Sequence, residues 1–234
     1  MDQDSGRTAY DADYYAANEQ GGDRLALWFY ARVASRLAPP GARVLEFGCG
    51  TGHMSRRMSA RFRTIAFDVS PYARERTAAV SPTTRVVADL DEVEDGSVDL
   101  AVSLHVLEHV PDPVPTFTRI GELLRPGGRF LYVVPNPQGW GHRIKREDWF
   151  AYRDETHCTL LSRAEWTELP RRAGLEVESV RADGLWDPPY VPKVPAVVQR
   201  PIAALPGAAQ VALGRTFLPA DWGECIIVTA RRAG

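Results

Sequence analysis

The sequence of 234 residues has little cysteine: Cys49, Cys158 and Cys225 lie far apart and show no Cys-x-x-Cys spacing. Such a scattered, odd-numbered set argues against a disulfide framework and favours a reducing compartment. The chain also lacks a run of about 18 apolar residues that could span a bilayer. Its opening residues, MDQDSGRTAY, contain no apolar stretch of the kind that marks a signal peptide. We therefore expect a cytoplasmic protein without a membrane span.

An excess of charge of one sign is missing as well. The chain has 28 Lys and Arg against 30 Asp and Glu, which gives a formal net charge of −2. A nucleic-acid-binding surface needs a strong local excess of basic residues, and the Arg pairs at 56–57, 171–172 and 231–232 are short and scattered. We expect no nucleic-acid partner. The 44% hydrophobic content suits one globular domain with a sizeable core.

Short apolar runs bounded by turn residues recur along the chain, as expected of buried parallel strands. They predict strands at 42–47, 64–67, 85–88, 98–102 and 129–134. The segments between them carry helix signals: Ser70-Pro71 and Asp112-Pro113 at helix starts, a capping box from Ser162 to Glu165, and a stop at Pro126-Gly127-Gly128. This alternation predicts an α/β fold with a doubly wound sheet, which binds ligands outside the carboxyl ends of its strands.

The stretch VLEFGCGTGH places three glycines, Gly48, Gly50 and Gly52, directly behind the first strand. Glycine permits positive φ and a close approach of the backbone to a ligand. A dinucleotide site would need its third glycine at position 53, which is His53. The acid before the turn, Glu46, would repel a pyrophosphate but suits a ligand with a cationic amine. A tight turn without a ligand and a dinucleotide oxidoreductase are the alternatives.

The residues from Glu46 to Gly52 resemble the E/D-x-G-x-G-x-G motif of class I S-adenosylmethionine (SAM) dependent methyltransferases, in particular the small-molecule, ubiquinone and natural-product group. The resemblance implies a Rossmann-like, seven-stranded sheet whose last strand is antiparallel. It also implies a helix at 24–37, ahead of the first strand, and sixth and seventh strands at 175–180 and 224–230. SAM is the expected cofactor.

The resemblance also assigns cofactor contacts at later strand ends. Asp68, which ends the second strand, would hold the ribose, and Asp89 would accept from the adenine amino group with Leu90 behind the ring. The stretch from Ser103 to Pro113 resembles the LEHVPDP segment that lines the methionine side. The expected cofactor-binding set is Tyr15, Glu46, Gly48, Cys49, Gly50, Gly52, Asp68, Val69, Asp89, Leu90, Ser103 and His105. Each acid also has a plain structural alternative: Asp68 could cap a helix and Asp89 could close a turn.

His105, Glu108 and His109 are spaced so that a helical segment would place them on one face. Such a trio could bind a metal ion, and a related E-x-x-E-H trio does so in some quinone and RNA methyltransferases. Here the first member is His105 instead of Glu, and the same LEH sequence occurs in many metal-free relatives. We therefore expect no metal.

The segment after the fifth strand is rich in Trp, Tyr, His and Gly, as a substrate lid can be. It contains the two candidate general bases, His157 first and His142 second, because histidine is the usual base near neutral pH. The pair Asp154 and His157 resembles a recurrent feature of the family. The structural alternative is that His157 hydrogen-bonds to backbone and fixes the loop onto the sheet.

We expect a single methyltransferase domain over residues 1–234. Within it, 1–40 would be a helical arm, 41–135 the SAM-binding core, and 136–161 and 184–222 substrate-covering insertions after strand 5 and between strands 6 and 7. The YDxxYY-like entry, Tyr10 to Tyr15, would fold over the cofactor. In the second insertion, 188–193 should be extended and 201–213 a short apolar helix, serving as a cap over the substrate or as a contact in a homodimer.

The predicted activity is transfer of a methyl group from SAM to a small-molecule acceptor, most simply a hydroxyl of a secondary metabolite, sugar or quinone-like compound. N- or C-methylation, and a SAM-binding protein repurposed as a cyclase or regulator, are the alternatives. The Ala-, Arg- and Pro-rich composition is compatible with natural-product biosynthesis in a high-GC bacterium.

Overall fold

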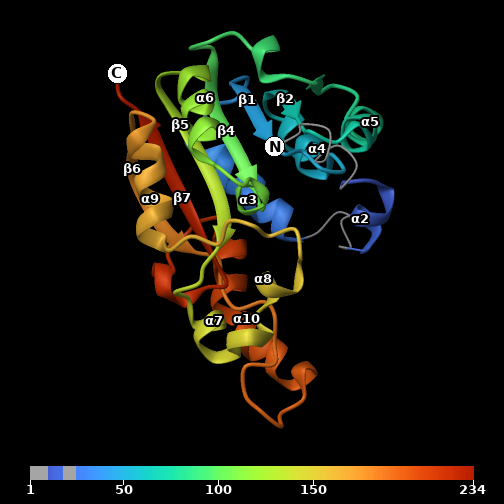
Figure 1. The fold of residues 1–234 in the computed structure, drawn as a ribbon, viewed down its shortest axis with the longest axis vertical. Coiled ribbons are helices and arrows are strands. Elements are labelled where there is room, and N and C mark those ends of the chain that lie inside the picture. The colour runs from blue at the N-terminus through green and yellow to red at the C-terminus, as the bar shows by residue number, and fades with distance from the viewer. Residues whose placement is uncertain (1–9, 18–24) are drawn as a thin grey trace. The chain divides into compact units, whose positions relative to one another are not determined.

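The computed structural model describes residues 10–17 and 25–234 (Figure 1). Arg24, the first residue of the predicted 24–37 helix, and residues 1–9 of the predicted arm lie outside them. The chain forms two compact units. The first contains the residues up to Ser103 together with Glu122–Arg129, and the second contains Leu104–Gly121 and Phe130–Ala233.

One seven-stranded sheet has the strand order β3-β2-β1-β4-β5-β7-β6. Strand β1 pairs in parallel with both β2 and β4, β2 pairs in parallel with β3, and β6 pairs antiparallel with β7. This confirms the predicted α/β class and the antiparallel last strand. The strand bounds are β1 Arg43–Phe47, β2 Arg63–Phe67, β3 Arg85–Val87, β4 Val98–Leu104, β5 Leu124–Pro135, β6 Leu175–Ala182 and β7 Cys225–Arg232.

The first unit surrounds strands β1 to β3 with helices. Its α5 begins as the sequence predicts: Pro71 occupies the first turn and the Ser70 side chain accepts a hydrogen bond from the Ala73 amide. The middle of β1 is fully buried, as the apolar run requires. The helical elements of this unit are α2 Ala12–Ala17, α3 Leu25–Leu37, α4 His53–Ser59, α5 Pro71–Val80 and the 3-10 turn η1 Leu90–Glu92.

In the second unit, α9 lies along the antiparallel pair β6 and β7 (Figure 1). The predicted capping box opens α9: the Ser162 hydroxyl accepts from the Glu165 amide, and the Glu165 carboxylate accepts from the Ser162 amide. Tyr132 donates to the Trp166 carbonyl at 2.8 Å, which fixes α9 to β5. The helical elements that follow β4 are η2 Leu107–His109, α6 Val114–Leu123, α7 Trp140–Lys145, η3 Arg146–Asp148, α8 Phe150–Arg153, α9 Arg163–Arg172, α10 Ala196–Leu213 and η4 Ala220–Trp222.

The predicted start of the fifth strand and the predicted conformation of segment 188–193 are wrong. Strand β5 starts at Leu124 instead of 129, so Pro126-Gly127-Gly128 lies within the strand. A Cβ on Gly128 would lie 3.0 Å from the Val98 carbonyl oxygen, which shows how closely the two backbones approach there. Segment 188–193 is not extended throughout, because Lys193 has φ of +64° and turns the chain.

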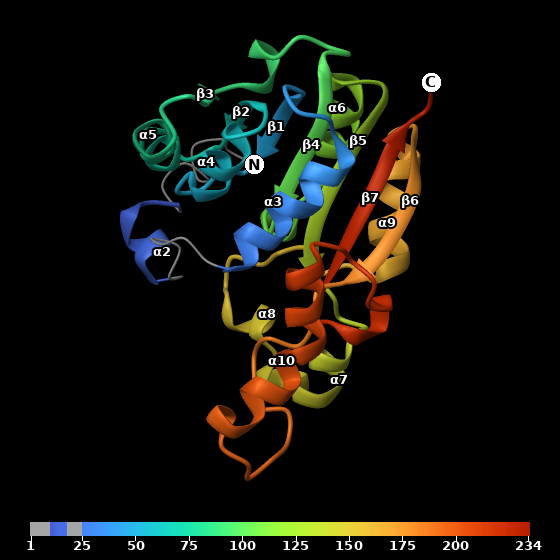
Figure 2. The ribbon, with the colours of Figure 1, turned by 180° about the vertical axis from the view of Figure 1, so that it is seen from behind.

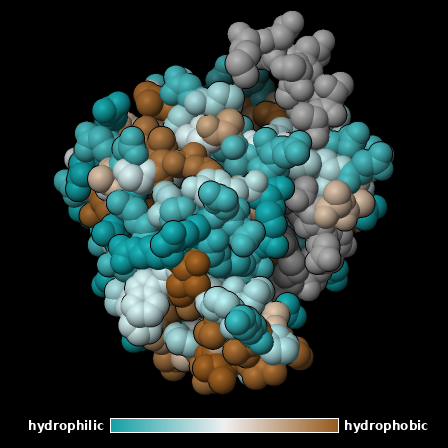
Figure 3. All heavy atoms as spheres, turned by 60° about the horizontal axis from the view of Figure 1, so that its bottom comes forward, coloured by the Kyte–Doolittle hydropathy of each residue, from teal (hydrophilic) through white to brown (hydrophobic). Residues whose placement is uncertain are grey.

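Helix α10 begins at Ala196, earlier than the predicted start at Pro201 (Figure 2). Pro201 and Pro206 both lie inside it, where each removes one amide donor from the helix. The earlier start is fixed by Gln199, whose side-chain amide hydrogen-bonds to the loop before the helix. Apolar side chains gather at the lower edge of Figure 3, over the end of the second unit that includes α10.

Candidate active site

The glycine turn between β1 and α4 is built as the sequence predicts. Gly48, Gly50 and Gly52 have φ values of +79°, +50° and +82°. The Gly48 amide donates to the Phe67 carbonyl at 2.8 Å, so the turn is held against the end of β2. A Cβ on Gly52 would lie 2.6 Å from the Thr77 Cα, and no side chain fits there. The turn therefore requires glycine both for its conformation and for its close packing.

Asp68 braces this turn from the end of β2. Its two carboxylate oxygens accept from the Gly50 and Ser70 amides, each at 2.9 Å. Burial raises the pKa of Asp68, and the two backbone hydrogen bonds oppose that rise. Because each carboxylate oxygen has two lone pairs, the group can still accept from ribose hydroxyls. The helix-capping alternative and the ribose role are thus compatible.

Glu46 is buried at the end of β1, and its Oε2 accepts a short hydrogen bond from the Ser55 hydroxyl in α4. Burial raises the pKa of Glu46 to about 8, the Ser55 bond lowers it, and the charge of Asp68 raises it further. A cation brought beside Glu46 would favour its ionised form. The carboxyl group is therefore suited to respond to a cationic ligand.

The other predicted contacts in the first unit differ in exposure. Val69 is exposed beside Asp68, Cys49 is buried in the turn, and Leu90 is partly exposed. Asp89 is exposed and caps η1, because its Oδ1 accepts from the Asp91 amide at 3.0 Å. Ser103 is fully buried, and its hydroxyl has no hydrogen-bond partner among the described residues.

The N-terminal arm packs on the residues around Asp68. Tyr15 is buried and stacks on Tyr72 of α5 with ring centroids 5.7 Å apart. The Tyr10 carbonyl accepts from the Ser70 hydroxyl. Burial raises the pKa of Tyr15, and the nearby charge of Asp68 raises it further. The arm thus lies against the turn that Asp68 holds.

In the second unit, His105 follows β4 with an unusual backbone. Its φ is +56°, a strained value for a residue with a side chain, and its amide donates to the Val133 carbonyl at 3.0 Å. The side chain is 41% exposed, and its Nδ1 lies 3.4 Å from Oε1 of Glu108. The carboxylate of Glu108 is fully buried, and neither of its oxygens has a hydrogen-bond partner among the described residues.

His157 lies on the other side of this carboxylate. Its Nε2 is 4.0 Å from Glu108 Oε1, while its Nδ1 is 2.6 Å from the Ala151 carbonyl oxygen. Since a carbonyl oxygen only accepts, Nδ1 carries a proton. The side chain is only 8% exposed. This geometry agrees with the structural alternative, in which His157 fixes the loop through backbone.

His109 completes the cluster. Its ring lies 4.6 Å from that of His157, and its Nδ1 is 2.8 Å from the Thr156 hydroxyl. Burial lowers the pKa of His109, although Glu108 opposes the shift. Glu108, His109 and His157 each offer a ligand atom, all within 4.8 Å of one another, so a divalent cation could be held here. The structure thus groups His157, not His105, with the two neighbouring candidates.

His142, the second candidate base, lies apart from this cluster in sequence and in contacts. It belongs to α7, where its Nε2 is 3.1 Å from the Tyr152 hydroxyl. Its ring meets Trp149 edge-on at 5.0 Å. His142 thus packs against the aromatic side chains of Trp149 and Tyr152.

Comparison with known proteins decides the family. A family model described as a methyltransferase domain matches residues 19–180, more than half of the chain. The chain belongs to this methyltransferase family. It is a SAM-dependent methyltransferase, and SAM is its cofactor.

The methyltransferase is 30% identical over 168 residues to a ubiquinone biosynthesis O-methyltransferase of Xanthomonas axonopodis pv. citri, covering 63% of this chain and 68% of the relative. Matches to relatives of the same name in Xanthomonas campestris cover only 47% of their length.

Two solved structures show the same fold. A Haloferax volcanii methyltransferase, solved in complex with the Trm112 methyltransferase activator, has a TM-score of 0.69 at 21% identity over 98% of each chain. A phosphoethanolamine N-methyltransferase of Haemonchus contortus, solved with SAM, has a TM-score of 0.58 at 16% identity over 90% of this chain and 57% of that one.

The turn residues of the methyltransferase fit SAM. The side-chain-free turn leaves room for close approach, and Asp68 has spare acceptor capacity at its edge. Asp89 is exposed with one carboxylate oxygen engaged by a backbone amide. The exposed side chain of Val69 offers an apolar surface for a ring. Asp68, Asp89 and the glycine backbone are the groups that would hold the cofactor.

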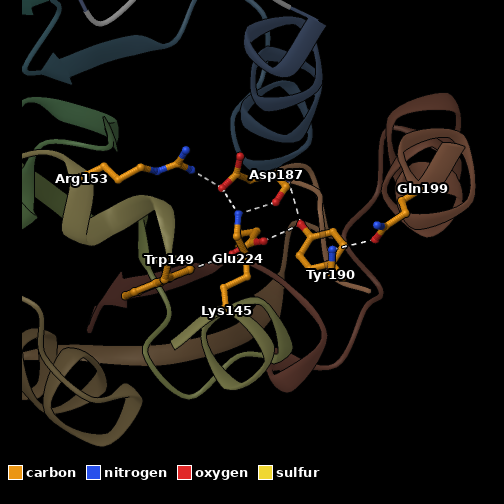
Figure 4. A network of polar contacts seen from close by, with 7 residues as sticks. All are labelled: Lys145, Trp149, Arg153, Asp187, Tyr190, Gln199 and Glu224. Atoms are coloured by element: carbon orange, nitrogen blue, oxygen red, sulfur yellow. Dashed lines mark hydrogen bonds and ion pairs between the residues drawn. The ribbon is translucent and has the colours of Figure 1, made fainter. Parts of the chain in front are cut away.

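A partly buried polar network in the second unit was not predicted from the sequence (Figure 4). Glu224 accepts from the Trp149 indole at 2.8 Å and from the Tyr190 hydroxyl at 2.5 Å. Asp187 pairs with both Lys145 and Arg153. The network ties the segment after β5 to the insertion between β6 and β7, so the two predicted covering segments are joined.

Two signals in the sequence could have indicated this network. Glu224 stands immediately before the apolar strand β7, and Asp183 stands at the end of β6, where a buried acid needs partners. Asp183 accepts from the Cys225 amide at 2.9 Å, and burial raises its pKa to about 7. Glu224 was predicted only as the first residue of the seventh strand, and Asp183 was assigned no role.

Proposed function

We propose that the methyltransferase methylates a hydroxyl group of a small organic acceptor, a secondary metabolite, sugar or quinone-like compound. The observation that carries this proposal is the pairing of His105 with Glu108. A partly exposed imidazole stands beside a buried carboxylate that has no hydrogen-bond partner among the described residues. The name of the Xanthomonas relatives, ubiquinone biosynthesis O-methyltransferase, supports oxygen as the acceptor atom. We extend the proposal to natural-product biosynthesis in the cytoplasm, on the composition and the scarce cysteine.

The chemistry needs a proton acceptor. SAM, when bound, supplies an activated methyl group for in-line transfer, so the chain must orient the acceptor and remove its proton. With Nδ1 turned toward Glu108, His105 presents Nε2 to a hydroxyl. Glu108 fixes the ring and stabilises the imidazolium that forms when the hydroxyl proton moves to Nε2.

His157 and His142, the bases predicted from the sequence, take other roles in this proposal. His157 donates from Nδ1 to backbone and is nearly buried, so we assign it to holding segment 151–158 beside Glu108. His142 shares a hydrogen bond with Tyr152 and packs on Trp149, so we assign it to the wall formed by α7 and α8.

The test compares His105→Ala and His157→Ala with the parent enzyme on a panel of phenols, catechols, sugars and amines, with S-adenosylhomocysteine formation as readout. His105→Ala should lower kcat on hydroxyl acceptors by about 10²–10⁴, a larger effect than any on SAM affinity. Added imidazole should restore part of the rate. His157→Ala should lower thermal stability more than the rate of the folded fraction.

Three outcomes would overturn the proposal or part of it. Methylation of amines alone would assign the enzyme to N-methylation. An unchanged kcat in His105→Ala would show that His105 is not the general base. Imidazole rescue of His157→Ala but not of His105→Ala would move the base to His157.

A further inference from the structure

Helix α10 exposes most of its large apolar side chains and buries polar ones. The residues that it buries include two glutamines, Gln199 and Gln210, and a glycine, Gly207. The residues that it exposes are mainly apolar, and Val197 and Ile202 are 77% and 69% exposed. A surface helix normally does the opposite and turns its apolar stripe inward.

The buried face of α10 is held by hydrogen bonds. The side chain of Gln199 accepts from the Tyr190 and Val191 amides, at 2.7 and 2.8 Å, and donates to the Val191 and Val194 carbonyls. Gln210 donates to the carbonyls of Ala182 and Asp183 and accepts from two amides farther along the chain. Both side chains use their full hydrogen-bonding capacity. These hydrogen bonds, together with the buried side chain of Val211, secure the helix to its unit.

The exposed large apolar side chains of α10 share one side of its first half. Val198, Ile202 and Leu205 follow at steps of four and three residues, and Figure 3 shows apolar side chains gathered over this end of the second unit. Contiguous exposed apolar surface of this kind marks an interaction site. The exposed large apolar side chains on α10 are Val197, Val198, Ile202, Leu205 and Leu213.

The charged residues within segment 188–220, which contains α10, have one sign, and the flanking acids Asp187 and Asp221 are engaged in ion pairs. The stretch from Pro188 to Ala220 contains Lys193, Arg200 and Arg215 and no acidic residue. All three cations are exposed, and none has an acidic partner within the described residues. By contrast, Lys145 and Arg153 share Asp187 as their acidic partner. An apolar helix face flanked by unpaired cations is complementary to a surface that carries anionic groups on the outside and has an apolar layer below them.

We propose that the exposed face of α10 docks on an anionic lipid surface, with the helix lying in the plane of the interface. No helix within the described residues is long and apolar enough to cross a bilayer, so docking would be peripheral. A symmetric contact with a second copy fits less well, because it would bring the same three cations together without an acid between them. This inference does not rest on the identity of the methyl acceptor.

The test is flotation of the full chain with vesicles of phosphatidylcholine alone and of equal parts phosphatidylcholine and phosphatidylglycerol. We expect binding to the mixed vesicles that weakens as salt is added. Ile202→Glu and Leu205→Glu should each reduce that binding at least about tenfold, because an acid replaces an inserted side chain. Arg200→Ala should reduce binding to mixed vesicles about fivefold.

The matched control is Val114→Glu, the same kind of exchange at an exposed valine of α6 in the same unit. It should bind vesicles like the parent chain. SAM affinity confirms that each variant is folded, and Ile202→Ser replaces Ile202→Glu if the latter fails that check.

The proposal is overturned if the parent chain binds neither vesicle type, or if folded Ile202→Glu and Ile202→Ser bind as strongly as the parent. It is also overturned if the parent chain sediments as a dimer that Ile202→Glu converts to monomers while vesicle binding is absent. That last result would assign the α10 face to a second copy of the chain.

Discussion

The candidate site residues of the two units differ in kind: backbone groups dominate in the first unit and side chains in the second. In the first unit the groups around the glycine turn are largely backbone amides and carbonyls. Asp68 accepts from two of these amides, and Glu46 accepts from the Ser55 hydroxyl. In the second unit the groups are side chains from distant segments: Glu108 meets His157, and Trp149 meets Glu224. A site of backbone groups depends on conformation, whereas a site of side chains depends on the identity of every partner.

The largest expected effect comes from breaking the side-chain network. Glu224→Ala leaves the Tyr190 hydroxyl and the Trp149 indole without their acceptor in a buried place. We expect the free energy of unfolding to fall by about 4 kcal/mol, while the folded fraction keeps its SAM affinity. Urea unfolding and calorimetry measure the two quantities. Glu224→Gln retains one acceptor and should lose less; an equal loss in both variants would contradict the account.

The second effect is a pH dependence in the backbone-built site. Because burial raises the pKa of Glu46 to about 8, the folded state keeps a proton that the unfolded state loses as the pH rises. The free energy of unfolding should therefore fall between about pH 5 and pH 8, by roughly 3 kcal/mol from this group.

Glu46→Gln, which keeps size and an acceptor for Ser55, should remove that part of the slope and be the more stable form near pH 8. Thermal melts of both proteins across this range measure the difference. Parallel pH profiles would show that Glu46 does not titrate as described.

The third effect is on cofactor affinity. Asp68→Ala removes the carboxylate that holds the Gly50 and Ser70 amides. The Kd for SAM should rise more than tenfold, since a hydrogen bond to a charged group contributes roughly 1.5–3 kcal/mol. Asp89→Ala, at an exposed position, should raise it less. Calorimetry on both variants tests the order, and the reverse order would place the ribose at Asp89.

The smallest effect separates conformation from function. Gly174 ends α9 with φ of +73°, and nothing lies within 4 Å of the Cβ that alanine would add. Gly174→Ala should therefore cost only the left-handed strain, about 1–2 kcal/mol, and leave SAM affinity and turnover unchanged. A change in SAM affinity would mean that the backbone conformation at the end of α9 affects cofactor binding.

The candidate site residues of the first unit were largely predictable, because short local sequence patterns determine where they lie. The glycines, Glu46, Asp68 and Asp89 all stand at strand ends, and strand ends follow from short apolar runs and turn residues. The cap at Ser70 was confirmed for the same reason, as was the capping box at Ser162 in the second unit.

The second unit was less predictable because its contacts join residues far apart in sequence. The spacing of His105, Glu108 and His109 suggested one cluster, but His157 enters it from a later loop. The predicted start of α10 was wrong. Gln199 fixes the first turn of the helix by hydrogen bonds to the preceding loop, and no short sequence pattern indicates those bonds.

Gly141 gives the buried network a practical consequence. A Cβ there would lie 1.9 Å from Oε2 of Glu224, so even alanine would displace the acceptor shared by Trp149 and Tyr190. Mutagenesis of this part of the second unit should therefore leave position 141 untouched and vary exposed positions such as Tyr152.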